Sequence, residues 1–274
     1  MTAISDLESV DTGTSELLAQ RDGAVLVLTL NRPERLNAIS GAMLSALSAQ
    51  LVRANKDPEV RCVVLTGAGR GFCSGLDLQD QQGRQGQAAE PRPQQLFDLR
   101  DSPPTVLWNM DKPVICALNG AAAGYGMDLA LLCDMRIASE NGAFAAVTAK
   151  RNLLPESGGT WLLPRLVGWG RAAEMFFRGQ VLRGRELLDA GLVNAVVTED
   201  QLMPTALAWA QEVARNAPMA VQLTKRMMRQ GLFETYETTV DHLLVHLRQL
   251  MSMQDFREGL AAFMERREPN FTGR

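Results

Sequence analysis

Apolar residues in the first two thirds of the chain fall into short runs bounded by Gly, Pro or Asn. The run at residues 24–30 is rich in Val and Leu, and Asn31-Arg32-Pro33 follows it, which is typical of a buried strand that ends at a turn. Runs of the same kind predict strands at 62–66, 114–118, 135–138 and 144–147. The second and third strands each lead directly into a glycine-rich turn, 67–71 and 119–126.

Two segments between these runs have the pattern of helices. Ser40 is a candidate N-cap for a helix that runs to about Asn55, with its apolar positions at Met43, Leu44, Leu47 and Leu51. The segment that follows the turn at 119–126 is almost wholly apolar to about Cys133, with Asp128 as the exception, so this helix should be buried. Repeated units of strand, glycine turn and helix predict an α/β core over residues 21–200.

The remaining segments differ in character from this core. Residues 1–20 are polar and acidic and are expected to form a flexible arm, and the Gly/Pro-rich, polar stretch 79–95 is expected to be a mobile surface loop. Beyond residue 200 the pattern is helical, with helices expected at about 200–216, 218–230, 234–252 and 255–267. Methionines on the apolar faces of this tail, residues 201–274, predict a domain that forms subunit interfaces.

Composition removes several classes of function. The chain has 274 residues, 46% of them hydrophobic, and a formal charge of −3 without a long basic run, which argues against nucleic acid as the main partner. It has no apolar stretch long enough to span a membrane and no signal-peptide pattern at its start. The four scattered cysteines suit neither a zinc site nor a disulfide scaffold, so we expect reduced core thiols and a cytoplasmic protein.

The chain has few residues that could support histidine-based or metal-based chemistry. The only two histidines, His242 and His246, lie four residues apart on an expected helix. Without a third ligand or an H-E-x-x-H pattern, a metal site is not expected there. A Ser-His-Asp or Cys-His mechanism has no histidine elsewhere to use.

Glu156 is the most informative single residue. It lies between Pro155 and the pair Gly158-Gly159, in a stretch that leads into an apolar segment. Burial among apolar neighbours raises the pKa of a carboxyl group toward neutrality, which suits a general acid/base. The alternative is a glutamate at a helix start that the helix dipole favours, and the stretch alone does not separate the two.

The two glycine-rich turns suggest what an acid/base could act on. Neither has the spacing of a dinucleotide fingerprint or the Gly-Lys-Ser/Thr ending of a phosphate loop, and most of these glycines are explained by close packing. The second turn nevertheless opens a buried helix, so its free amides can hold negative charge that develops on a carbonyl oxygen. With a second amide from residues 72–78 and a nearby carboxylate, the turns form a site for generating enolates.

Four motifs together resemble the crotonase, or enoyl-CoA hydratase/isomerase, superfamily over nearly the whole chain. They are LNRPERLNA at 30–38, GRGFCSGLDL at 69–78, NGAAAGYGMDLA at 119–130 and LPESGGTW at 154–161. Segments 256–259 and 269–271 also look like the C-terminal end of that family. The resemblance implies a spiral of β-β-α units with a C-terminal helical domain, assembly as a trimer or dimer of trimers, and acyl-CoA thioester substrates.

The resemblance also implies roles for particular residues. The backbone N–H groups of Leu76 and Tyr125 would form the oxyanion hole. No separate cofactor is implied, because coenzyme A is part of the substrate. The residues that the resemblance places along coenzyme A are Arg35, Ala38, Ser74, Gly75, Asp77, Leu78 and Gly124, with Phe271 closing on a neighbouring subunit's adenine.

The reaction depends on which carboxylates are present. Hydratases of this family have two glutamates, at the positions of Asp128 and Thr148, and Thr148 cannot act as a base at neutral pH. One branch of isomerases instead has a single acid at the position of Glu156, and so, as an Asp, does the isomerase of ring-1,2-epoxyphenylacetyl-CoA. The expected activity is therefore an enoyl-CoA isomerase in which Glu156 moves the proton, with Asp128 as an assisting acid or a hydrogen-bonded helix residue. The alternatives are a hydratase that uses Asp128 and Glu156, and a catalytically silent CoA-binding protein.

Overall fold

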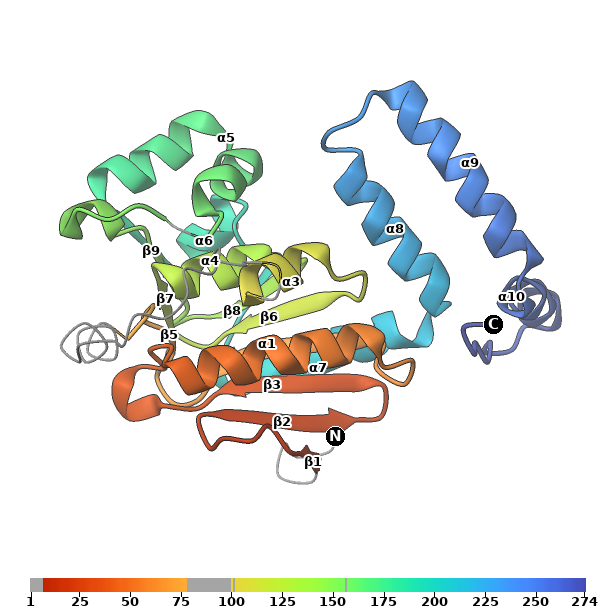
Figure 1. Cartoon of the computed structure of the whole chain (residues 1–274), viewed down its shortest axis with the longest axis horizontal. Helices are drawn as coiled ribbons and strands as arrows, with labels where there is room; N and C mark the ends of the chain where they lie inside the picture. Colours follow the sequence, from red (N-terminus) through yellow and green to blue (C-terminus); the bar gives the residue numbers. More distant parts are fainter. Residues whose placement is uncertain (1–6, 78–99, 101, 156) are drawn as a thin grey trace, which may run out of the picture.

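A seven-stranded sheet forms the centre of the molecule in a computed structural model that describes residues 7–77, 100, 102–155 and 157–274 (Figure 1). Its first three strands are antiparallel, and from the third strand onward the neighbours are parallel. In spatial order the strands are β1 (Glu8–Val10), β2 (Leu17–Asp22), β3 (Val25–Leu30), β4 (Cys62–Gly67), β6 (Val114–Leu118), β8 (Met135–Ser139) and β11 (Ala195–Val197).

A smaller, four-stranded sheet lies beside the first. Its order is β10 (Val181–Arg183), β9 (Ala143–Ala145), β7 (Ala121–Ala123) and β5 (Gly71–Cys73). The chain passes from one sheet to the other three times in succession, from β4 to β5, from β6 to β7 and from β8 to β9. Helices α4 (Tyr125–Leu132) and α5 (Gly159–Arg178) follow the second and third passages. The expected spiral of β-β-α units is therefore confirmed.

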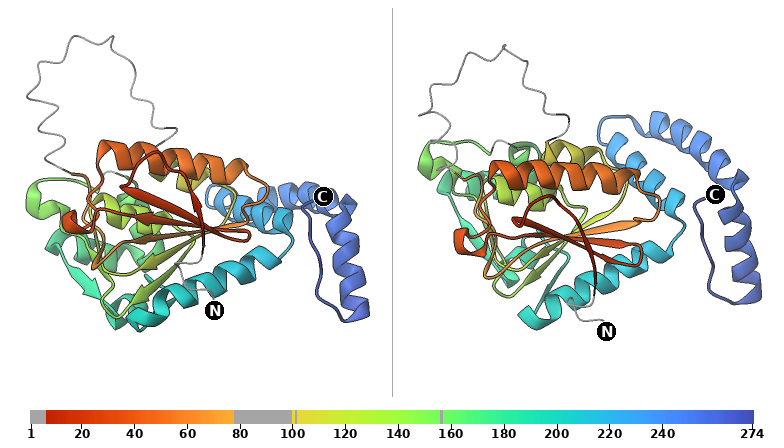
Figure 2. Two further views of the ribbon diagram at one scale, coloured as in Figure 1. Left: turned by 90° about the horizontal axis from the view of Figure 1, so that it is seen from below. Right: turned by 60° about the horizontal axis from the view of Figure 1, so that its bottom comes forward.

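Helices cover both faces of the large sheet. On one face α7 (Glu199–Arg215) packs Leu202, Ala206 and Ala210 against apolar side chains of β3, β4, β6 and β8. On the other face lie α1 (Gly41–Lys56), α3 (Pro103–Asn109) and α4 (Figure 2). The expectation that the helical tail begins at residue 201 is wrong for α7, because its apolar stripe is buried on the sheet.

The expectation of a flexible arm over residues 1–20 is also wrong from residue 8 onward. Strands β1 and β2 pair with each other, and β2 pairs with β3 along its whole length. Leu17 and Ala19 are buried on this strand, while Leu18 between them is exposed. This alternation is the pattern of a half-buried strand. It is short and polar residues flank it, so the sequence alone did not reveal the strand. The expected loop at 79–95 lies outside the described residues.

The last three helices extend away from the sheets (Figure 1). Helix α8 (Pro218–Gln230) is tied to the core, since Lys225 Nζ lies 2.7 Å from Asp134 Oδ2 and Arg229 Nη2 lies 3.1 Å from Asp111 Oδ1. Helix α9 (Tyr236–Ser252) has no buried residue, and α10 (Gln254–Glu265) carries exposed Phe263 and Met264. The expected helical tail is present here. None of the helices in the described part of the chain is long and apolar enough to cross a membrane.

Ser40 caps α1 as the sequence predicts, and its removal gives a test of the fold. Its Oγ accepts a hydrogen bond of 3.0 Å from the Met43 amide and also contacts the Glu16 carboxylate on the loop before β2. Loss of a helix N-cap costs about 1 kcal/mol, so we expect Ser40→Ala to lower the free energy of unfolding by about that amount in urea titration. Ser45→Ala, on the exposed face of the same helix, is the control and should have little effect.

Candidate functional site

The segment after β3 makes a tight bend that a buried asparagine holds in place. Pro33–Arg35 forms a short 3-10 helix, and Asn37 follows it with a positive φ of 55°. The Asn37 Oδ1 accepts from the Arg32 amide at 2.9 Å, and its Nδ2 donates to the carbonyls of Ala68 and Gly71 at 2.9 and 2.7 Å. Asn37 therefore joins this bend to the glycine turn after β4.

A second asparagine fastens the same glycine turn from the other side. Asn119, at the end of β6, accepts from the Gly67 amide at 3.1 Å and donates to the Gly69 carbonyl at 2.8 Å. Asn37 and Asn119 both donate to the buried carbonyl of Gly71, at 2.7 and 3.1 Å. A buried carbonyl that loses its donors costs free energy, so both side chains stabilise the turn. Both asparagines lie within the motifs at 30–38 and 119–130, but neither was selected from the sequence as a site residue.

Strands β5 and β7 bring the two glycine-rich segments to one place. They are parallel neighbours, with Gly71 opposite Ala121, so their C-terminal ends leave the small sheet at the same edge. β5 continues into residues 74–77 and β7 into Gly124, the N-cap of α4. The two segments touch there, since a Cβ atom on Gly126 would lie 2.4 Å from the Cys73 carbonyl oxygen.

The amide of Leu76 is directed by a bridge to the bend after β3. The Ile39 amide donates to the Gly75 carbonyl at 2.8 Å, and the Asp77 amide donates to the Ile39 carbonyl at 3.0 Å. In this parallel bridge Ile39 bonds to Gly75 and Asp77, the residues on either side of Leu76. The N–H of Leu76 itself therefore points away from Ile39. Gly75 has a φ of 107° and its ideal Cβ position is 3.8 Å from the Tyr125 nitrogen, so Leu76 and Tyr125 are brought close together.

The carboxylate of Asp77 anchors this turn. It is 4% exposed, and its Oδ2 lies 3.0 Å from Arg32 Nη1 and its Oδ1 lies 3.4 Å from Arg35 Nη2. Arg32 also donates to the Ala38 carbonyl at 2.8 Å. The residue next to Leu76 is thus tied by an ion pair and by a backbone bond to the bend after β3.

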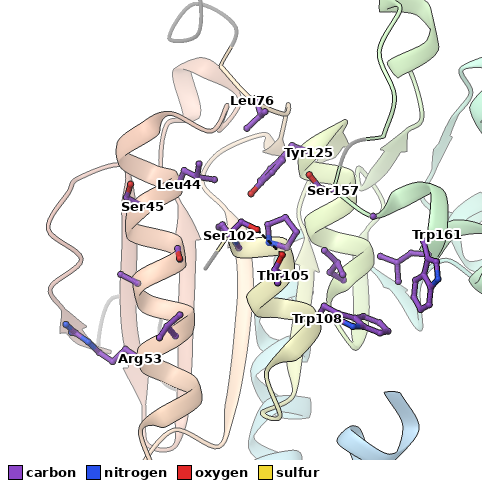
Figure 3. A pocket seen from close by; sticks show the side chains of 18 of the residues that line it. Leu44, Ser45, Arg53, Leu76, Ser102, Thr105, Trp108, Tyr125, Ser157 and Trp161 are labelled. Atoms are coloured by element: carbon purple, nitrogen blue, oxygen red, sulfur yellow. Dashed lines mark hydrogen bonds between the residues drawn. The ribbon is translucent and has the colours of Figure 1, made fainter. Parts of the chain in front are cut away.

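A cavity of about 1420 Å³ opens below Leu76 and Tyr125, between α1, α3 and the start of α5. Leu76, Tyr125 and Ser157 gather at one end, and Arg53 and Trp108 lie at the other (Figure 3). The lining is mainly apolar, as in most sites for small organic ligands. Further lining residues are Leu44, Val52, Pro103, Leu132, Gly158, Trp161, Leu162 and Phe233.

Three aromatic rings pack together on the wall of this cavity. The Trp108 and Trp161 rings meet edge to face at 4.9 Å between centroids, and the Phe233 ring stacks on Trp161 at 5.7 Å. The guanidinium carbon of Arg165 lies 3.9 Å from the centroid of the Trp161 ring. Such contacts hold the rings in fixed orientations and make this wall rigid.

Asp128 is the buried carboxylate of the site. It lies in the first turn of α4, is 1% exposed, and its Oδ2 accepts a 2.9 Å hydrogen bond from the Ser157 amide. Ser157 and Gly158 line the cavity, so Asp128 contacts a segment that faces the cavity. Glu156, the residue before Ser157, lies outside the described residues, and so does Leu78.

The structure brings together most of the residues that the sequence analysis selected. The residues that it places in and around the bend after β3, the turn at 74–77 and the start of α4 are Arg35, Ala38, Ser74, Gly75, Leu76, Asp77, Gly124 and Tyr125. Phe271 is elsewhere in the chain: its ring packs on Gly259 of α10, and its carbonyl accepts a 2.6 Å bond from Arg61. It is not among the described residues that line the cavity.

The cysteines and histidines take no part in this site. All four cysteines are buried and none forms a disulfide, as expected for core thiols, and burial raises the pKa of the Cys62 and Cys73 thiols to about 12. His242 Nδ1 lies 3.1 Å from Glu234 Oε2 on the outer helices. No group of three or more candidate metal ligands occurs within residues 7–77, 100, 102–155 and 157–274.

Comparisons with known proteins point in one direction. Residues 20–274 match the family model described as "Enoyl-CoA hydratase/isomerase". The chain is 38% identical to 1,2-epoxyphenylacetyl-CoA isomerase of Escherichia coli K12, over 94% of this chain and 98% of the relative. It is 36% identical to 2,3-dehydroadipyl-CoA hydratase of the same organism, over 95% and 100% of the two chains.

Solved structures agree with the sequence relatives. The crystal structure of an enoyl-CoA hydratase from Bacillus anthracis superposes with a TM-score of 0.86 at 32% identity, covering 94% of this chain and all of the other. An enoyl-CoA hydratase from Mycobacterium tuberculosis superposes with a TM-score of 0.85 at 29% identity, covering 95% of this chain and 100% of that one.

The backbone of Gly75 provides a test of this site. Its φ of 107° disfavours any residue with a Cβ, and a Cβ there would lie 3.3 Å from the Ala123 carbonyl oxygen. We expect Gly75→Ala to displace the Leu76 amide and to lower turnover of enoyl-CoA esters by about 10²–10³-fold, the usual cost of one lost oxyanion donor.

Gly13→Ala is the matched control for this substitution. Gly13 also has a positive φ, of 73°, but lies in the loop between β1 and β2 with nothing within 4 Å of an added Cβ. Its variant should keep wild-type turnover. Unchanged turnover in Gly75→Ala would mean that the reaction takes place at another part of the molecule.

Proposed function

The chain belongs to the enoyl-CoA hydratase/isomerase family, and from this premise we propose that it is an enoyl-CoA isomerase. The observation that carries the proposal is the close approach of the turn at Gly75 to the first residue of α4, at the end of a largely apolar cavity that Leu76 and Tyr125 line. Two converging backbone donors are what stabilises negative charge on a thioester oxygen, and the N-terminal end of α4 adds its positive dipole.

In the proposed mechanism the thioester carbonyl accepts from the amides of Leu76 and Tyr125. Glu156 takes a proton from the carbon next to the carbonyl of a 3-enoyl-CoA, and the electron pair of that C–H bond passes into an enolate. The carboxyl group then returns the proton two carbons further along the chain. The double bond moves into conjugation with the thioester, and the base is regenerated without a net change in charge.

The surroundings of the cavity support a mechanism with one proton-transferring carboxyl group rather than the two glutamates of the usual hydratases. Thr148, which stands where the second glutamate of the hydratases would be, begins a short 3-10 helix after β9 and is not among the described residues that line the cavity. Its hydroxyl is no base at neutral pH. The segment that carries Glu156 in the sequence, by contrast, has Ser157 and Gly158 in the cavity wall.

The proposed coenzyme A site is the outer surface of the same turns. Arg35 and Ser74 are exposed there, and Ser74 Oγ donates to the Arg35 carbonyl at 3.3 Å. The guanidinium of Arg35 is 40% exposed and available to phosphate groups on the solvent side of Asp77. The acyl group would then extend from Leu76 and Tyr125 toward Trp108, Trp161 and Phe233, so a chain or a ring is a suitable occupant.

Hydration of a 2-enoyl-CoA is the second candidate, and one contact favours it. Asp128 lies against the segment that follows Glu156, which is where a second acid would have to be to hold a water. Relatives of both kinds, an isomerase and a hydratase, are similar to the chain to nearly the same degree. The products separate the candidates, because hydration yields a 3-hydroxyacyl-CoA and isomerisation yields the conjugated enoyl-CoA.

Glu156→Gln gives the decisive variant. Glutamine keeps the size of the side chain but cannot carry a proton, and general acid–base catalysis contributes about 10²–10⁴-fold. We expect turnover of 3-enoyl-CoA to fall by that factor with acyl-CoA affinity near that of the wild type. The measurement is product analysis after incubation with 2-enoyl-CoA, 3-enoyl-CoA and a ring-epoxide CoA ester.

Glu212→Gln is the control, since Glu212 lies on the exposed side of α7 and should leave turnover unchanged. Full activity of Glu156→Gln on every ester of the panel would contradict the assignment of the acid/base. A wild-type protein that only hydrates 2-enoyl-CoA would favour the second candidate.

We also propose that the chain assembles with copies of itself through its last helices. The exposed apolar residues in this region are too many for an isolated helical tail, since large exposed patches mark interfaces. They are Met228, Leu232, Phe233, Tyr236, Leu243, Leu244, Val245, Leu247, Met251, Phe256, Leu260, Phe263 and Met264.

Light scattering tests this assembly. We expect a trimer or a hexamer at micromolar concentration, because closed symmetric assemblies bury such faces. Phe263→Asp, which places a charge where an 80% exposed phenylalanine stands, should shift the mass toward smaller species. A wild-type monomer at the same concentration would contradict the proposal.

A further inference from the structure

Asp128 has an unusual position for a carboxylate. Seven other residues of α4 are buried with it, and they are apolar or aromatic apart from glycine. Its own amide donates to the Gly124 carbonyl at 3.1 Å as part of the helix. Burial of a charge in such surroundings is costly unless donors compensate for it, so its partners on the next segment decide what it does.

One of its partners is a backbone group at the beginning of α5. The Ser157 amide donates to Asp128 Oδ2 at 2.9 Å, and Gly158 caps the helix with a φ of 107°. The carboxylate therefore lies at the positive end of the α5 dipole, which favours a negative charge. The peptide nitrogen that donates is also the one that joins residue 157 to Glu156 in the chain.

The Asp128 carboxylate lies closer to the backbone at residue 159 than any side chain there would allow. A Cβ atom on Gly159 would lie 2.2 Å from Asp128 Oδ1 and 3.1 Å from Asp128 Cγ. Gly170, farther along α5, has open space where a Cβ atom would be added. Gly159 is thus the residue that permits the carboxylate to reach the Ser157 amide.

We propose that Asp128 is a positioning residue, which holds Ser157 and the start of α5 and so fixes the backbone from which Glu156 extends. The inference rests on the proposed function, in which Glu156 moves the proton. It assigns Asp128 the role of a hydrogen-bond acceptor, in contrast to a second acid that exchanges protons with the substrate or a water.

Asparagine and alanine at residue 128 separate these roles. Asparagine keeps an oxygen that accepts from the Ser157 amide but cannot exchange a proton, and alanine does neither. We expect Asp128→Ala to lower kcat by about 10–100-fold with KM little changed, since a small displacement of a catalytic group costs this much. Asp128→Asn should recover most of that loss, and its pH–rate profile should keep the shape of the wild type.

A double-mutant cycle with Gly159 tests the contact itself. Gly159→Ala should lower kcat as Asp128→Ala does, because the methyl group displaces the carboxylate. The double variant should be no slower than Asp128→Ala alone, since the group that the methyl overlaps is then absent. Gly170→Ala is the matched control on α5 and should leave kcat unchanged.

Hydrogen–deuterium exchange gives a measurement that does not depend on the reaction. In Asp128→Ala the Ser157 amide loses its acceptor, so exchange in residues 157–163 should become faster, while Asp128→Asn should keep the protection of the wild type. Faster exchange together with no isomerase activity in the wild type would reject the proposed function and leave the positioning contact intact.

Three results would overturn the inference. They are an Asp128→Asn variant as slow as Asp128→Ala, a pH–rate profile that loses a limb in Asp128→Asn, and additive losses in the cycle with Gly159→Ala. The first two would make Asp128 a proton-transferring acid, and the third would show that the carboxylate and residue 159 act independently.

Discussion

The contact between the Cys73 carbonyl and the Cα atom of Gly126 is the constraint on which the site depends. No side chain fits between these two backbone segments, because a Cβ atom on Gly126 would be 2.4 Å from that carbonyl oxygen. The pairing of β5 with β7 sets the direction of both segments, and this contact sets their separation. Only with both in place do the amides of Leu76 and Tyr125 converge.

Buried polar side chains then prevent the turns from relaxing. Asn37, Asn119 and Asp77 each bind backbone or guanidinium groups on a segment far away in the sequence. Asn37 and Asn119 both donate to the buried Gly71 carbonyl, and Asp77 accepts from Arg32, so the loss of one of them leaves buried polar groups with fewer partners. The turns that carry the proposed donors are therefore held by the fold before a ligand arrives, which is the condition for effective electrostatic stabilisation.

Much of this arrangement could be predicted from the sequence, and the remainder has physical reasons. The strands at 62–66 and 114–118 were predictable because each is a continuous apolar run, and the glycine turns because each follows such a run. β2 was missed because its alternation lasts only six residues, and α7 was placed in the tail although its stripe packs on the sheet. The hydrophobic pattern of a segment predicts which face of the strand or helix is apolar, but only the folded structure shows what packs against that face.

The contact of Asp128 with Ser157 illustrates the same limit within the site. The two residues are 29 positions apart, and no periodicity or motif connects an acid in one helix to the amide before another. The sequence therefore favoured Glu156 as the proton carrier but left the role of Asp128 open. The structure supplies one partner of Asp128, and that partner is an amide of the chain itself.

The division between backbone and side-chain groups explains how one fold can serve several reactions. In the proposed mechanism the groups that stabilise the enolate are backbone amides of residues 76 and 125, which a side-chain substitution does not remove. The group that moves the proton in that mechanism is a side chain, which a single substitution can replace. An isomerase needs one proton carrier next to the donors, whereas a hydratase of the two-carboxylate type needs a pair around a water. Asp128 Oδ2 accepts from the Ser157 amide, and this contact is consistent with the proposed isomerase mechanism, in which one carboxylate carries the proton.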